Sequence, residues 1–215
     1  MVQQETWIID SDSAKIIKAN YLMIGSEEAN TKLAGEIRSL LEAKRQQLVC
    51  AESCTAGLVA ATLAKWPGIS GWLCGSLVVY QTNIKHQWLG IASDVLEDPS
   101  IGPVSKQVTG QLACRALELT PGATLAIAVT GHLGPGAPEH LDGVIFVSLA
   151  LRHGENFSGQ QQIELLVEQM FQLKGDEEQS PQKFGSGFGM ELRAERMLRG
   201  VSHVLTVLRD HLQRS

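Results

Sequence analysis

A run of small polar side chains at residues 52–57 is the first part of the sequence that could carry chemistry. It reads Glu-Ser-Cys-Thr-Ala-Gly and separates a short apolar segment from a predicted helix. A helix N-terminus presents unpaired backbone N–H groups, which favour anionic ligands and also a thiolate. Ser53 and Cys54 are therefore competing candidate nucleophiles. The alternative is structural, with Ser53 or Thr55 capping the helix and Glu52 beside its dipole.

A second candidate is the glycine-rich loop at residues 130–138, which follows the most apolar segment, 125–129. Closely spaced glycines allow backbone amides to approach a ligand. The loop contains neither the Gly-Lys-Ser/Thr of a phosphate loop nor a dinucleotide fingerprint. An ordered turn without a ligand is the alternative. Since both turns follow buried strands of one sheet, we expect them to contribute to a shared site.

Lys85, with Tyr80 five residues before it, is the third candidate. A lysine near a buried site has its pKa lowered by desolvation and can act as the general base for a serine. The alternative is an ordinary solvated lysine on a short helix. The sequence contains no Gly-x-Ser-x-Gly, and among its six histidines only His132 and His140 lie near the candidate loops.

The elements that must position these residues alternate between helices and short apolar strands. Apolar residues at helical spacing predict a helix that begins after Ser26 and others at 58–65, 82–89, 104–119 and 190–212. Near-continuous apolar runs predict strands at 47–51, 72–80, 125–129 and 144–149, whereas 162–173 fits a strand or a helix. This alternation predicts an α/β fold, a three-layer α/β/α sandwich around a mostly parallel or mixed sheet.

The chain has 215 residues, of which 44% are hydrophobic and 19% charged, a composition typical of a globular domain that needs no metal or disulfide. We expect residues 1–25 to be an N-terminal extension and 26–215 to be one domain. Within that domain, the polar, glycine-containing segment 174–189 is expected to be a mobile loop.

Charge and cysteine usage limit the partners that we expect. A formal net charge of −5 disfavours sequence-independent binding of nucleic acid, and no apolar run is long enough for a membrane span. Four scattered cysteines predict free thiols rather than disulfides or a zinc site. Together with an N-terminus unlike a secretory signal, these features predict a cytoplasmic protein.

Four segments together resemble the C-terminal domain family of the competence/damage-inducible protein CinA, whose stand-alone members include nicotinamide-nucleotide amidases. These segments are residues 51–57, 79–90, 102–105 and 128–136, and the resemblance spans roughly residues 30–152. It implies hydrolysis of the carboxamide of nicotinamide mononucleotide to nicotinic acid mononucleotide and ammonia. It also implies a small-molecule nucleotide substrate, no cofactor or metal, and a homodimer.

By this resemblance Ser53 is the nucleophile, Lys85 is the base that activates it, and Tyr80 orients or relays the proton. Backbone amides of the glycine-rich loop hold the carboxamide or the oxyanion, and the turn after residue 52 holds polar parts of the nucleotide. The implied substrate-binding residues are Glu52, Cys54, Thr55, Gly57, Thr130, Gly131, Gly134 and Arg193.

The chain departs from the family pattern at several positions of this site. Ala56 replaces a glycine, His140-Leu141 replaces Lys-Pro, and Phe188-Gly189 replaces Asp-Arg. The alternative function is therefore a catalytically silent relative that binds a nucleotide or a protein. A redox sensor that uses Cys54 is a third hypothesis.

Overall fold

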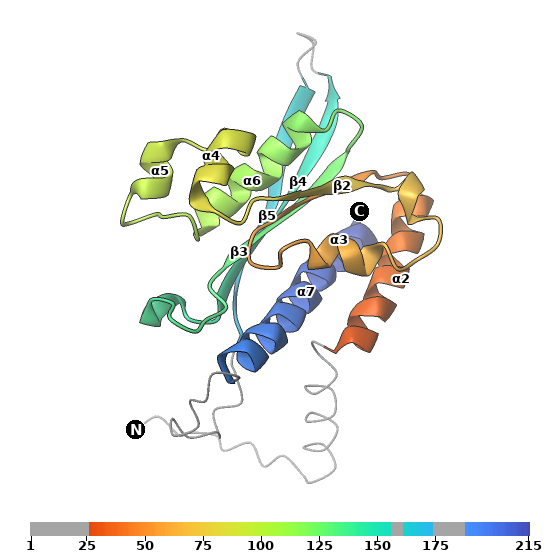
Figure 1. Cartoon of the computed structure of the whole chain (residues 1–215). Helices are drawn as coiled ribbons and strands as arrows, with labels where there is room; N and C mark the ends of the chain where they lie inside the picture. The colour runs from red at the N-terminus through yellow and green to blue at the C-terminus, as the bar shows by residue number, and fades with distance from the viewer. Residues whose placement is uncertain (1–25, 156–160, 174–187) are drawn as a thin grey trace, which may run out of the picture.

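The computed structural model describes residues 26–155, 161–173 and 188–215. In these ranges the chain forms a five-stranded sheet with helices on both faces, the α/β/α sandwich expected from the sequence (Figure 1). The predicted extension 1–25 and residues 174–187 of the predicted loop lie outside the described residues. The last two residues of that predicted loop, Phe188 and Gly189, belong instead to a helix.

The sheet is mixed. Its strands are β1 (Leu48–Glu52), β2 (Leu73–Val78), β3 (Leu125–Gly131), β4 (Val144–Glu155) and β5 (Gln161–Gln172), in the spatial order β2-β1-β3-β4-β5. The first three strands in this order are parallel, and β4 and β5 are antiparallel to their neighbours. The carboxyl ends of β1, β2 and β3 consequently meet at one edge, where open α/β sheets bind ligands.

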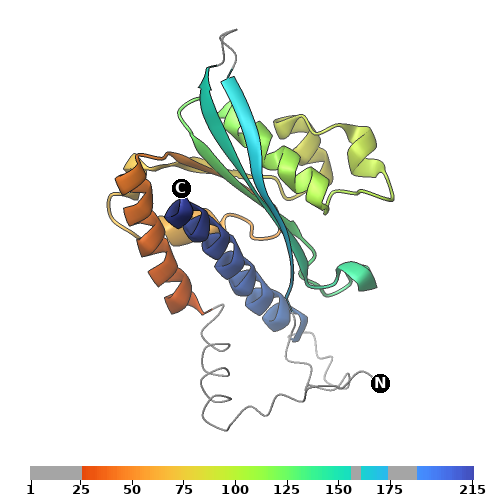
Figure 2. The ribbon, with the colours of Figure 1, turned by 180° about the vertical axis from the view of Figure 1, so that it is seen from behind.

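In the described ranges, helices cover both faces of the sheet (Figures 1 and 2). One face carries α2 (Glu27–Lys44), α3 (Leu58–Leu63) and α7 (Phe188–Arg214), and the other carries α4 (Thr82–Leu89), α5 (Ser93–Glu97) and α6 (Lys106–Leu119). Short 3-10 turns occupy Ile69–Gly71 and Glu139–Leu141. None of the helices in the described ranges has both the length and the apolar character needed to cross a bilayer.

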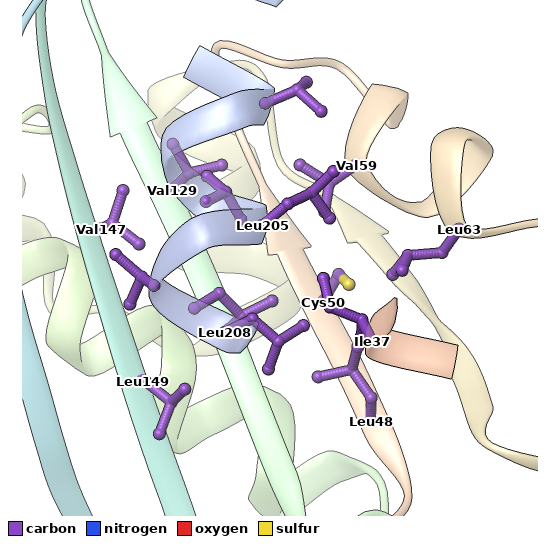
Figure 3. Packing of buried hydrophobic residues seen from close by; sticks show 14 of the residues in the cluster. Ile37, Leu48, Cys50, Val59, Leu63, Val129, Val147, Leu149, Leu205 and Leu208 are labelled. Carbon is purple, nitrogen blue, oxygen red and sulfur yellow. The ribbon is translucent and has the colours of Figure 1, made fainter. Parts of the chain in front are cut away.

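Large aliphatic side chains fill the layer between the sheet and α2, α3 and α7. Figure 3 shows residues of the three helices turned toward residues of β1, β3 and β4, with Leu208 of α7 and Ile37 of α2 near Leu48 and Cys50. The burial of these side chains is the main source of stability on this face.

The opposite layer is built from small residues. The sheet presents Ala51, Ala126, Ala128 and Ala150 to α6, which contributes Ala113 and Ala116 beside Leu112 and Leu117. Because alanines face alanines, α6 can approach the strands closely. The first turn of α6 lies at the carboxyl edge of the sheet, where the Thr109 hydroxyl is 2.7 Å from the Thr130 hydroxyl near the end of β3.

The structure corrects some of the predicted boundaries. Helix α6 begins at Lys106 rather than residue 104, because Ser105 is its N-cap and accepts a hydrogen bond from the Val108 N–H at 3.2 Å. The ambiguous segment 162–173 is the edge strand β5, paired with β4 over most of its length. Helix α5 was not predicted. The predicted helix start after Ser26 is confirmed, since Ser26 caps α2 and its hydroxyl accepts a hydrogen bond from the Ala29 N–H at 3.1 Å.

Candidate functional site

The carboxylate of Glu52 organises the turn that follows β1. The residue is 1% exposed, and its oxygens face the first turn of α3, where backbone N–H groups have no partner within the helix. Oε2 accepts hydrogen bonds from the Thr55 hydroxyl (2.8 Å) and the N–H groups of Gly57 (2.9 Å) and Val59 (3.1 Å), and Oε1 from the Ala60 N–H (3.0 Å) and the Ser76 hydroxyl (3.0 Å). The Glu52 carboxylate is therefore a structural anchor for this turn.

Two consecutive residues of the turn have left-handed backbone conformations. Gly57 has φ 96°, which glycine adopts without cost, but Ala56 has φ 51°. The Ala56 N–H donates to the Ser53 carbonyl at 3.1 Å, so this conformation belongs to a hydrogen-bonded turn. Ala56 is exposed, so its methyl group faces solvent and does not narrow the site. Alanine at this position instead strains the backbone, because a Cβ disfavours the left-handed conformation.

Ser53 and Lys85 are hydrogen-bonded to each other. Lys85 is 2% exposed, and its Nζ donates to Ser53 Oγ at 3.0 Å and to the Val79 carbonyl at 3.1 Å. Burial lowers the pKa of Lys85 from 10.5 to about 8. The interpretation of Lys85 as a solvated surface residue is therefore wrong, and a neutral amine at this position can accept the Ser53 proton.

Cys54 has the opposite electrostatic character. Its thiol is 3% exposed, and burial raises the pKa of Cys54 to about 12. A raised pKa disfavours the thiolate at neutral pH, which argues against Cys54 as a nucleophile or a redox sensor. Its Sγ lies against Gly131, where an added Cβ would be 3.1 Å from Sγ and 2.8 Å from the Val144 carbonyl oxygen. Glycine is therefore required at position 131 for the turn and the loop to meet.

Arg193 of α7 joins two segments of the site. Its Nη1 donates to the Gly134 carbonyl at 2.8 Å, and its Nη2 donates to the Tyr80 hydroxyl. Tyr80 is 50% exposed, and its hydroxyl forms no hydrogen bond with Ser53 or Lys85. Arg193 thus links the segment after β2 to the loop after β3.

These elements enclose a pocket of about 250 Å³. One side is formed by Ser53, Cys54, Tyr80 and Lys85, and the other by residues 131–137 together with Arg193. The structure thus brings together seven of the residues that sequence analysis assigned to the site, including its complete catalytic set: Ser53, Lys85, Tyr80, Cys54, Gly131, Gly134 and Arg193.

Four other assigned residues do not line this pocket, and their assignment to substrate binding stays a prediction. Glu52, Thr55 and Gly57 form the anchored turn. The Thr130 hydroxyl is buried and lies 2.7 Å from the Thr109 hydroxyl. The Thr109 hydroxyl donates its one hydrogen to the carbonyl of Ser105, the N-cap of α6. Thr130 is therefore the donor of the bond between the two hydroxyls, which links β3 to α6.

The pocket also has lining residues that the sequence did not assign to the site. Thr82 at the start of α4 and Pro103 and Val104 just before α6 line it; all three lie in segments that carry the family resemblance, but no role was assigned to them. His132 also lines it, and burial, with the nearby Arg193 charge, lowers the pKa of its imidazole. His132 is therefore a neutral polar group of the wall at pH 7.

A wider groove of about 730 Å³ lies over α6 and β5. The charged groups in it pair with one another, with Lys106 Nζ 3.3 Å from Glu168 Oε2. Within the described part of the chain, no three His, Cys, Asp or Glu side chains are grouped so that they could hold a metal ion. A nucleophile and a base meet in the smaller pocket, which we take as the candidate active site.

A family model and the relatives of this chain point to the same protein family. Residues 30–170 match the family model of the CinA C-terminal domain. The nicotinamide-nucleotide amidohydrolase PncC of Enterobacter agglomerans is 35% identical over 139 residues, which are 64% of this chain and 83% of that protein. A CinA-like protein of Chlorobium phaeovibrioides is 38% identical over 125 residues, 57% of this chain, but the chain spans only 28% of its length.

Solved structures share the fold. A competence/damage-inducible protein, CihA, from Agrobacterium tumefaciens is 27% identical with a TM-score of 0.63, over 86% of this chain and 95% of that one. The competence damage-inducible protein A from Klebsiella pneumoniae is 24% identical with a TM-score of 0.64, over 86% and 97% of the two chains.

Ala56→Gly is expected to stabilise the protein, because glycine adopts the left-handed conformation that strains alanine. The free energy of unfolding, measured with urea, should rise by about 1 kcal/mol. The matched control is Ala60→Gly inside α3, where the same substitution should lower it by about 0.5–1 kcal/mol. A loss of stability in both variants would contradict strain at Ala56.

Glu52→Gln is expected to destabilise the protein, because an amide NH₂ would face donors that now bond a carboxylate oxygen. We expect a loss of about 3 kcal/mol in the free energy of unfolding. Glu42→Gln on α2 is the control: Glu42 is half-exposed in a pair with Arg38, and its loss should cost at most about 0.5 kcal/mol. Equal losses in the two variants would disprove the anchoring role of Glu52.

Proposed function

The chain belongs to the CinA C-terminal domain family, and we propose that it is an amidohydrolase that converts nicotinamide mononucleotide and water to nicotinic acid mononucleotide and ammonia. The observation that carries this proposal is the buried pair of Ser53 Oγ and Lys85 Nζ, 3.0 Å apart at the pocket. The relative from Enterobacter agglomerans, of which the chain covers 83%, is named for this activity.

Acylation begins when neutral Lys85 accepts the proton of the Ser53 hydroxyl. Ser53 Oγ forms a bond to the carboxamide carbon, and the carbonyl oxygen becomes an oxyanion. As that oxyanion collapses, the C–N bond breaks and the departing nitrogen takes the proton from Lys85 Nζ, so that ammonia leaves. A water molecule then loses a proton to Lys85 and attacks the ester, and Ser53 Oγ regains its proton as the acid is released.

Backbone N–H groups of the loop after β3 are suited to hold the oxyanion. Thr130 and Gly131 pair with Phe146 and Ile145 of β4 in the sheet ladder. Gly134 lies beyond the ladder, lines the pocket, and donates no backbone hydrogen bond to any residue in the described ranges. We therefore assign oxyanion binding to the loop around Gly134 rather than to the end of the strand.

Arg193 supplies positive charge for the phosphate of the nucleotide. Its guanidinium lines the pocket and forms no ion pair with a carboxylate of the described residues. Arginine binds phosphate through paired N–H groups, and a guanidinium without a carboxylate partner is available for this. The pocket accepts the nicotinamide ring beside Ser53, with the phosphate toward Arg193.

Purified wild-type protein is expected to release ammonia from nicotinamide mononucleotide, and Ser53→Ala should lower kcat by on the order of 10³-fold or more because the nucleophile is lost. Ammonia release measures this, and Ser100→Ala on an exposed loop is the matched control, expected to keep the wild-type rate. An undiminished rate in Ser53→Ala would exclude Ser53 as the nucleophile. No release by the wild type, but a rise in melting temperature with the nucleotide, would identify a silent binding relative.

The pH dependence of kcat/KM should report the protonation of Lys85. Only the neutral amine accepts a proton, so kcat/KM should rise about tenfold per pH unit at low pH and level off above the pKa of Lys85, about 8. Lys85→Arg should be inactive at every pH in this range, since a guanidinium stays charged. A profile that is flat through pH 8 would contradict the assignment of Lys85 as the base.

A further inference from the structure

A partly buried ion pair that the proposed mechanism does not use connects α7 to the loop between β3 and β4. Arg196 is 7% exposed, and its Nη1 and Nη2 donate to Oδ1 and Oδ2 of Asp142 at 2.8 and 2.9 Å. Nη1 also lies 3.3 Å from the Leu133 carbonyl oxygen, to which it donates. A bidentate pair of this kind fixes orientation as well as distance.

The guanidinium fills space that two glycines leave open. Gly134 has φ 65° and Gly143 has φ 71°, both in the left-handed region. A Cβ at Gly134 would lie 2.8 Å from Arg196 Nη1 and 2.7 Å from Asp142 Oδ1, and one at Gly143 would lie 3.2 Å from Arg196 Cζ. The backbone of the loop is therefore shaped around this ion pair.

The same ion pair contacts both ends of the loop. The loop is closed at its base, where the His132 N–H donates to the Val144 carbonyl at 2.9 Å and the Gly143 N–H donates to the His132 carbonyl at 2.8 Å. Just above this base, Arg196 bonds Leu133 on one side and Asp142 on the other. The segment between them includes residues 133–137, which form a wall of the pocket.

We propose that Arg196 and Asp142 are a positioning pair that holds residues 133–137 against the Ser53–Lys85 side of the pocket. The effect on turnover rests on the proposed function, whereas the ordering of the loop rests on the contacts alone. Loss of Asp142 leaves a buried guanidinium without its counter-charge, and the loop must open to hydrate it. Loss of Arg196 leaves a carboxylate that is already 40% exposed, so its consequence is smaller.

The first test is Asp142→Asn, with nicotinamide mononucleotide as substrate at a temperature where the variant is fully folded. We expect kcat/KM to fall at least tenfold, while the pH midpoint set by Lys85 stays in place, because Lys85 lies on α4. Glu195→Gln is the matched control: it breaks the Arg199–Glu195 ion pair on the same helix and should leave kcat/KM unchanged. An unchanged kcat/KM in Asp142→Asn would overturn the positioning role.

The second test is a double-mutant cycle. Arg196→Gln should lower kcat/KM less than Asp142→Asn, and the double variant should recover part of the activity lost in Asp142→Asn, because no buried charge is left unpaired. A purely structural pair would instead show the coupling in melting temperature, with kcat/KM per folded molecule equal in all variants. That result would overturn the proposal.

Hydrogen exchange separates this proposal from the proposed function. In Asp142→Asn, exchange over residues 131–143 should become at least tenfold faster, while exchange over β1 stays at the wild-type rate. This readout needs no substrate, so it decides whether the pair holds the loop even if the wild type releases no ammonia. Unchanged exchange over 131–143 would overturn the proposal regardless of activity.

Discussion

The site depends on the burial of the Glu52 carboxylate at the end of β1. Five donors from the turn, α3 and β2 converge on it, so the start of α3 and the course of the chain after the strand are fixed by one side chain. Successive residues of a strand point to opposite faces of the sheet. With Glu52 directed toward α3, the next residue, Ser53, is directed toward the face that carries α4 and Lys85. Anchoring one residue thus orients the candidate nucleophile beside it.

The unequal packing of the two sheet faces makes room for that arrangement. Large aliphatic residues separate the sheet from α7, whereas alanines let α6 lie close to β1 and β3. On this closely packed side, Lys85 is buried without a carboxylate partner in the described part of the chain. Keeping its charge there costs on the order of 3 kcal/mol, given the lowering of its pKa to about 8. The rest of the fold must supply that stability, a common feature of catalytic groups.

Helix α7 completes the site from the far end of the chain. Arg193 and Arg196 lie about one turn apart on the helix, and they reach Gly134 and Asp142, 59 and 54 residues earlier in the sequence. Because α7 is packed against the sheet through residues such as Leu205 and Leu208, both arginines are held on a rigid element (Figure 3). A glycine-rich loop, which by itself has little conformational preference, acquires one conformation from these contacts.

The sequence by itself determined the local structure. Apolar periodicity predicted the α/β sandwich and placed the helix at 82–89 where α4 begins and ends, and the small polar residues after β1 made Ser53 and Cys54 candidate nucleophiles. The edge strand β5 stayed ambiguous between strand and helix because half of its residues are polar and the aliphatic run 165–167 breaks a strict alternation. Only the tertiary structure decided that Lys85 and Cys54 are buried and that Glu52 and Thr130 are bonded internally. The physical reason is that periodicity and capping act between near neighbours, whereas desolvation and the choice of hydrogen-bond partner depend on residues that are far apart in the chain and meet only in the folded state.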